Sequence, residues 1–269
     1  MHRQSFFLVP LICLSSALWA APATVNVEVL QDKLDHPWAL AFLPDNHGML
    51  ITLRGGELRH WQAGKGLSAP LSGVPDVWAH GQGGLLDVVL APDFAQSRRI
   101  WLSYSEVGDD GKAGTAVGYG RLSDDLSKVT DFRTVFRQMP KLSTGNHYGW
   151  PLATWGINYS GFKIPEAKGE IVAGTEQPVF YWKDSPAVSG MAFYNSDKFP
   201  QWQQKLFIGA LKDKDVIVMS VNGDKVTEDG RILTDRGQRI RDVRTGPDGY
   251  LYVLTDESSG ELLKVSPRN

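Results

Sequence analysis

The strongest constraint on the fold is a repeated unit of strand, Pro-Asp turn and second strand. One copy opens with Trp38–Asp45 (WALAFLPD), a second with Leu85–Asp93 (LLDVVLAPD) and the last with Ile240–Gly249 (IRDVRTGPDG). Apolar and polar residues alternate with period two in several copies, which predicts strands. A turn that returns every 40–50 residues or so is typical of a propeller blade. The sequence therefore favours an all-β β-propeller over a β-sandwich or a barrel, which also have short strands.

Four units are recognisable, and no segment shows the 3.6-residue periodicity of a helix. We expect blades at residues 37–61, 85–122, 188–221 and 240–265. The second and third units are separated by about two periods rather than one. The intervening region, 123–187, contains no clear blade, and we expect it to be irregular.

The first twenty residues have the pattern of a secretory signal. Arg3 precedes an apolar run from Phe6 to Trp19, and Ala20 offers a cleavage site. The run is too short to span a bilayer, so no membrane anchor is expected. Cleavage near Ala20 would leave residues 21–269 as a single, incomplete propeller domain in the periplasm. It would also remove Cys13, the only cysteine, which excludes disulfides and thiolate metal sites from the mature chain.

Several polar residues precede inner strands or end second strands of the repeat. In a propeller, the innermost strand of each blade lines the central channel, and the segment leading into it lies at the channel mouth. Gln82, Arg239, Arg241 and His36 occupy such positions, and Lys212 ends a second strand. Because Arg239 and Arg241 are two residues apart, they face the same side of an extended segment and can bind one anion together. The pattern indicates a site for a polyanionic small molecule.

The same residues also have simpler interpretations. Arginines and lysines at strand ends are commonly solvated, and Gln82 stands among glycines that suit a turn. His147 alone is as compatible with a surface or core histidine as with a base. Asp87 and Asp242 lie on inner strands, where they can bond neighbouring backbone, and we assign them no chemistry. The net charge of −2 argues against nucleic acid as a partner.

Five motifs, in the same order along the chain, give a specific resemblance to a known family. They are His80–Asp87 (HGQGGLLD), Thr144–His147 (TGNH), Tyr148–Pro151 (YGWP), Gly209–Lys212 (GALK) and Arg239–Asp242 (RIRD). Together they resemble the soluble pyrroloquinoline quinone (PQQ)-dependent sugar dehydrogenases, and within them the periplasmic bacterial aldose sugar dehydrogenases. The resemblance covers essentially the whole chain.

The resemblance implies a six-bladed propeller with PQQ and calcium at the top of the channel. It implies oxidation of aldoses at the anomeric hydroxyl, with His147 as the general base. It implies a backbone carbonyl of Tyr148 as a calcium ligand. The implied PQQ-binding residues are Gln82, Tyr159, Lys212, Arg239 and Arg241. A cationic pocket suits the three carboxylates of PQQ, and hydride transfer to a quinone needs a base at the sugar hydroxyl.

The chain departs from the family at one place. In family members a long stretch separates the Gly-Asn-His and Tyr-Gly-Trp-Pro motifs, and it brings an Arg-Asn pair to PQQ and an acidic ligand to calcium. Here His147 is joined directly to Tyr148. Roughly two blades of about 40–50 residues each are therefore missing between these residues, and we expect an impaired enzyme.

Two other functions compete with an impaired dehydrogenase. One is a non-catalytic propeller used for binding, which the deletion favours. The other is a metal-dependent hydrolase of the lactonase kind, which needs several inward-facing carboxylates where this chain has cations. We expect a monomer with an aldose as substrate, and the sequence does not identify the electron acceptor.

Overall fold

The computed structural model describes residues 25–107, 113–137, 149, 151–157 and 161–268. Regular structure in these residues is almost entirely β, as predicted, and forms four four-stranded antiparallel sheets. The exceptions are the single-turn helix α1 (Phe94–Ser97) and the 3-10 turn η1 (Pro200–Trp202). None of the helices in the described part of the chain has the length and apolarity that crossing a membrane requires.

Each sheet forms one blade, and three of the four follow the chain in order. Blade I contains β2 (Pro37–Phe42), β3 (Met49–Leu53), β4 (Glu57–Gln62) and β5 (Gly66–Leu67). Blade II contains β6 (Leu85–Leu90), β7 (Arg99–Val107), β8 (Ala113–Leu122) and β9 (Val129–Arg137). Blade III contains β10 (Val188–Phe193), β11 (Leu206–Ala210), β12 (Val216–Asn222) and β13 (Lys225–Ile232). The four predicted units are confirmed.

Blade IV is built from both ends of the described chain. It contains β14 (Ile240–Thr245), β15 (Leu251–Thr255), β16 (Gly260–Pro267) and β1 (Val25–Leu34). The N-terminal strand pairs antiparallel with the C-terminal one, Val27 opposite Val265. This pairing covers the outer edge of β16, which would otherwise expose unpaired backbone groups.

The sequence analysis missed the outermost strand of each blade. For β9 this makes the expectation of an irregular region at residues 123–187 wrong in part. Residues 129–137 lie inside the region expected to be irregular, yet they pair with β8, for example Val117 opposite Phe136. The segment carries Arg133 and Arg137 and has only one buried side chain, Val129. A strand at a solvent-exposed edge needs no apolar alternation, so the period-two signal was weak.

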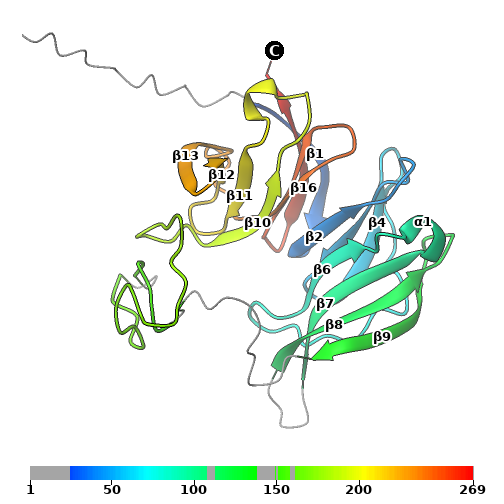
Figure 1. Ribbon diagram of the computed structural model, residues 1–269. Helices are drawn as coiled ribbons and strands as arrows, with labels where there is room; N and C mark the ends of the chain where they lie inside the picture. Colours follow the sequence, from blue (N-terminus) through cyan, green and yellow to red (C-terminus); the bar gives the residue numbers. More distant parts are fainter. Residues whose placement is uncertain (1–24, 108–112, 138–148, 150, 158–160, 269) are drawn as a thin grey trace, which may run out of the picture.

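The blades stack in the order III, IV, I, II, with inner strands in contact: β10 with β14, β14 with β2, and β2 with β6. Apolar cores fill the three junctions. In the described residues no comparable packing joins blade II to blade III. Figure 1 shows these two blades at the two ends of the row, so the ring predicted from the resemblance is open here.

Tyr194 ties blade III to blade IV and gives a test of this packing. Its fully buried hydroxyl donates to the Gly249 carbonyl at 2.8 Å and accepts from the Phe199 amide at 3.0 Å. Tyr194→Phe removes the hydroxyl and leaves a buried N–H without a partner. We expect the free energy of unfolding in urea to fall by about 2 kcal/mol. Tyr250→Phe is the matched control, because no hydrogen bond of its hydroxyl is found among the described residues, and an equal loss in both variants would contradict this assignment.

Candidate functional site

The antiparallel blades bring one set of loops to the same end of the channel. Residues just before an inner strand and just after a second strand lie at this end, which we call the mouth. His36 precedes β2, Arg239 precedes β14, Arg54 follows β3 and Asp256 follows β15. Backbone bonds link these positions across blades: the Leu85 amide donates to the Arg54 carbonyl at 3.1 Å, for example.

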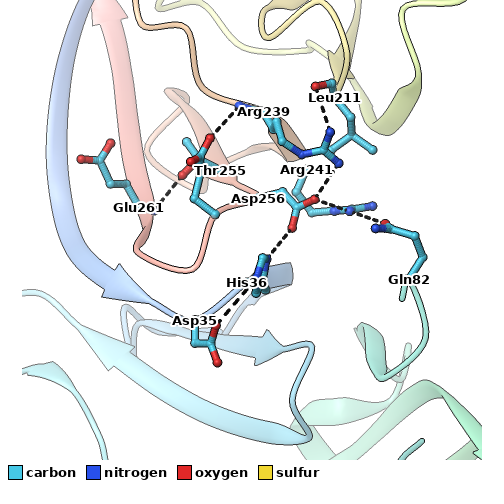
Figure 2. A network of polar contacts seen from close by, with 10 residues as sticks. Asp35, His36, Gln82, Leu211, Arg239, Arg241, Thr255, Asp256 and Glu261 are labelled. Atoms are coloured by element: carbon cyan, nitrogen blue, oxygen red, sulfur yellow. Dashed lines mark hydrogen bonds and ion pairs between the residues drawn. The ribbon is translucent and has the colours of Figure 1, made fainter. Parts of the chain in front are cut away.

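The Asp256 carboxylate is the centre of a polar network at the mouth (Figure 2). One oxygen accepts from Arg241 Nη2 at 2.5 Å and from Arg239 Nη2 at 3.1 Å, and the other contacts His36 Nδ1 at 3.1 Å. Burial acts to raise the pKa of Asp256, but the charge of Arg241 and hydrogen bonds from His36, Arg241 and Arg239 outweigh it. The pKa therefore lies below its usual value, and the carboxylate stays ionised.

Arg241 is the most buried cation of the mouth, with 7% of its side chain exposed. Its guanidinium lies 3.9 Å from the centre of the Trp38 ring and donates from Nη2 to Gln82 Oε1 at 2.7 Å. Its Nε is buried and has no hydrogen-bond partner among the described residues. Burial lowers the pKa of Arg241; Asp256 opposes this effect, and the charges of Arg239 and Arg54 add to it. A buried guanidinium crowded by two further arginines favours an anionic ligand.

Lys212 lies at the same end of the channel as the arginine pair. Arg239 Nη1 donates to the carbonyl of Leu211, the preceding residue, at 3.4 Å, and Lys212 Nζ pairs with Asp184 at 2.5 Å. The structure thus brings together Gln82, Lys212, Arg239 and Arg241, which come from three different blades. Their role as PQQ-binding residues remains a prediction. His147, Tyr148 and Tyr159 lie outside the described residues.

A second polar network lies within the channel, on the inner strands. Arg244 Nε pairs with Asp242 at 2.9 Å, and its Nη2 reaches Asp87 of blade II at 3.2 Å. Asp242 also accepts from the Leu40 and Val243 amides, and burial raises its pKa to about 6. Both aspartates bond backbone, as expected, but the sequence analysis did not foresee that Arg244 would join blade II to blade IV. These side chains line a cavity of about 290 Å³ that extends to Arg241.

An aromatic pocket of about 680 Å³ lies beside the mouth, in the segment before blade III. Trp155 and Tyr181 stack with their ring centres 4.7 Å apart, and Trp182, Glu166 and Glu170 complete much of the wall. Ser185 also lines the pocket and directly follows Asp184, the partner of Lys212. The sequence analysis did not identify this pocket, because its residues come from the region expected to be irregular.

The fold is that of a β-propeller, and the mouth is a cationic site at one end of its channel. Comparisons with known proteins identify the family. The chain belongs to the Glucose / Sorbosone dehydrogenase family, which it matches over residues 34–147 and 141–264. It is 72% identical to the aldose sugar dehydrogenase YliI of Escherichia coli over 371 aligned positions, covering 100% of both chains.

Solved structures agree with this assignment. The E. coli soluble aldose sugar dehydrogenase in its apo-form is 71% identical, with a TM-score of 0.86 over 91% of this chain and 100% of that one. A glucose dehydrogenase is 45% identical, with a TM-score of 0.85 over 90% and 100%. A PQQ-bound aldose sugar dehydrogenase from Streptomyces coelicolor, at 19% identity and a TM-score of 0.64 over 92% and 100%, shares the fold.

The comparisons also bear on the deletion. The alignment with the E. coli relative spans 371 positions and covers all 269 residues of this chain, so 102 positions have no counterpart here. The family match is in two parts that meet at residues 141–147. Both observations agree with the predicted loss of about two blades between His147 and Tyr148.

Asp256→Asn tests the network at the mouth. Removing the charge leaves buried Arg241 without its counter-ion, and we expect the free energy of unfolding at neutral pH to fall by about 3 kcal/mol. The pKa of Asp256 is lower in the folded than in the unfolded chain, so its contribution is present above about pH 4 and disappears as the pH falls through the folded value. Urea titrations should therefore show the gap between wild type and variant closing in acid.

Asp124→Asn serves as the control for this experiment. Its carboxylate is 81% exposed and pairs with Arg98 and Arg121 on the surface of blade II. Exposed pairs contribute about 0–1 kcal/mol, so this variant should unfold nearly as wild type does. A loss for Asp256→Asn no larger than that of the control would contradict the network as described.

Proposed function

We propose that the chain is a PQQ- and calcium-dependent aldose dehydrogenase, impaired by its internal deletion, that oxidises aldoses at the anomeric hydroxyl. The observation that carries the proposal is the gathering of Gln82, Lys212, Arg239 and Arg241 at one mouth. Membership of a sugar dehydrogenase family supports it, as does the PQQ named for the Streptomyces relative.

The residues of the mouth fit PQQ. A flat molecule with three carboxylates needs several convergent cations, and Arg239, Arg241 and Lys212 supply them. The buried Nε of Arg241 has a hydrogen to donate and no partner among the described residues. Gln82 accepts from Arg241 with its carbonyl oxygen, which leaves its amide N–H groups available for a ligand. When bound, PQQ supplies the acceptor for a hydride from the sugar.

The aldose would bind next to this cluster. The stacked Trp155 and Tyr181 offer apolar ring faces, and Glu166 and Glu170 offer acceptors for hydroxyl groups. In this proposal His147 takes the proton of the anomeric hydroxyl and Tyr159 contacts the cofactor. Export after cleavage near Ala20 would place the reaction in the periplasm.

Calcium has the weaker support. Its proposed ligand is a carbonyl of Tyr148, and the described residues contain no cluster of three or more histidine, cysteine or acidic side chains that suits a metal. Calcium prefers six to eight oxygen ligands, with carboxylates among them. We therefore assign no step of the reaction to it.

The deletion favours one alternative, a propeller that binds an anionic ligand without turning over a sugar. The cationic mouth is retained, whereas the stretch that follows His147 in the family is gone. A lactonase-like hydrolase has less support, because the described part of the mouth gathers arginines around a single buried carboxylate rather than several carboxylates around a metal.

Arg239→Ala tests the cofactor site independently of activity. Loss of a charge-assisted hydrogen bond costs about 1.5–3 kcal/mol, so PQQ should bind about 10- to 100-fold more weakly. Titration with PQQ while tryptophan fluorescence is recorded measures this affinity. Arg121→Ala removes an arginine of similar exposure from the outer part of blade II and should leave the affinity unchanged. Equal affinities for both variants and wild type would contradict the site.

A steady-state assay with PQQ, calcium, an aldose and a dye acceptor tests catalysis. We expect turnover at least about a hundredfold below that of the E. coli relative, because a PQQ-contacting Arg-Asn pair and an acidic calcium ligand are missing. Any remaining activity should disappear in His147→Ala, since a base acts only within reach of its proton. Turnover equal to that of the relative would show that the deletion is tolerated. PQQ binding without turnover would support the binding module instead.

A further inference from the structure

The aromatic pocket in the segment before blade III is held together by backbone bonds of that segment. The Thr154 amide donates to the Gly169 carbonyl at 3.0 Å. The Ile157 amide donates to the Lys183 carbonyl at 3.3 Å. These bonds bring three stretches of the segment together around Trp155, so the walls of the pocket do not depend on contact with another blade.

Blade III anchors the pocket on one side (Figure 1). Trp182 Nε1 donates to Glu228 of β13 at 2.9 Å, and the Trp182 ring packs against the apolar cluster on β11 and β12. On the side of the mouth, the Lys212 amide donates to the Pro186 carbonyl at 3.0 Å. The pocket is therefore fixed next to the cations of the mouth.

The wall of the pocket combines aromatic rings with hydrogen-bonding groups. The rings of Trp155, Tyr181 and Trp182 line it and offer apolar faces to the C–H groups of a ligand. Trp155 Nε1 is buried and has no hydrogen-bond partner among the described residues, so its hydrogen is available to a hydroxyl oxygen. Gln177 adds a side-chain amide. A sugar ring, with apolar faces and hydroxyls at its edge, matches both kinds of group.

The charged side chains of the pocket are all acidic. Glu166 and Glu170 line it, and none of its described lining residues is a lysine, an arginine or a histidine. Among the described residues neither glutamate has an ion-pair partner. The lysines of the segment, Lys163, Lys168 and Lys183, are exposed and lie outside the wall. A ligand in the pocket therefore meets uncompensated negative charge.

A second acidic group adjoins the pocket through Trp182. Glu228, the hydrogen-bond partner of Trp182, pairs with Arg231 at 2.7 Å. The same guanidinium pairs with Asp213 at 2.7 Å and with Asp215 at 3.1 Å. Three carboxylates around one cation leave this group negative as well. Aromatic faces beside negative charge are the surroundings in which proteins bind organic ammonium groups.

We propose that this pocket selects amino sugars, which are aldoses with an ammonium group in place of one hydroxyl. The inference rests on the proposed function, because it takes the pocket as the place where the aldose binds, and it adds the class of aldose. Neutral aldoses bind through the rings and hydrogen bonds alone. Sugar acids are repelled by Glu166 and Glu170. The two neighbouring sites thus take ligands of opposite charge, an anion at the mouth and a cation in the pocket.

Titration of the full chain with sugars, followed by tryptophan fluorescence and without PQQ, tests the selection. At about pH 6, where the amine is protonated, D-glucosamine should bind about tenfold more tightly than D-glucose. Neither D-glucuronate, which carries the wrong charge, nor ethanolamine, which lacks the ring, should displace glucosamine at equal concentration. Equal affinities for glucosamine and glucose, no measurable binding of glucosamine, or its displacement by either competitor would overturn the proposal.

A double variant, Glu166→Gln with Glu170→Gln, removes the charge of the wall and keeps its size. The amide oxygens still accept from hydroxyls, so affinity for glucose should change by less than about twofold. The preference for glucosamine over glucose should also fall to within about twofold. Glu176→Gln is the matched control, because Glu176 is an exposed glutamate of the same segment outside the wall, and it should keep the preference. A preference that survives in the double variant, or an equal loss in the control, would contradict selection by the pocket.

These titrations distinguish failure of the inference from failure of the proposed function, because they require neither PQQ nor turnover. A chain that prefers glucosamine in the way described, but neither binds PQQ nor oxidises a sugar, would support the selective pocket and contradict the proposed function. A chain that binds PQQ and oxidises glucose and glucosamine with equal KM would overturn the selection and leave the proposed function in place.

Discussion

The packing of one apolar sheet face on the next governs the rest of this structure. A four-stranded sheet has two faces, and the central blades IV and I bury both of theirs against neighbours. This packing fixes the direction of each inner strand and thereby delivers residues such as His36, Arg239 and Gln82 to the same end. The site depends on the order of the blades, because its residues come from loops that are far apart in the sequence and meet only when the blades pack. The same constraint makes the faces of blades II and III that meet no other blade the least buried apolar surfaces among the described residues.

Within the site, one buried carboxylate makes the clustering of cations possible. Arg239 and Arg241 both reach Asp256, and Arg241 is too buried to be stabilised by water alone. A guanidinium in such a place needs a counter-ion, and a single aspartate shared by two arginines leaves the local charge positive. An anionic ligand can therefore bind without displacing the network. Trp38 supports the arrangement by offering its ring face to Arg241.

The sequence predicted the blades and the mouth because both follow from periodic patterns. The Pro-Asp turn repeats with the inner strand, so the position of Arg239 relative to Pro247 was enough to place it at a channel opening. Asp256 carried no such signal: it follows β15 in a turn, where an aspartate is common and usually exposed. Its importance comes from partners that are 15 and 220 residues away in the sequence. The outer strands β5, β9 and β13 escaped notice for a related reason, since edge strands bury few side chains and need no regular alternation.

The deletion is expected to affect anion binding and catalysis to different degrees. Binding of an anion at the mouth depends on cations held by blades III and IV and on Gln82 of blade II, and the three junctions that join blades III, IV, I and II are present in the described chain. Catalysis demands more, because a base must be held within hydrogen-bond reach of one particular proton, and the proposed base, His147, is followed directly by Tyr148 instead of the long stretch that the family resemblance implies. Electrostatic attraction falls slowly with distance, whereas proton transfer requires contact. If the proposed function holds, a shortened propeller of this kind keeps affinity for PQQ better than it keeps turnover.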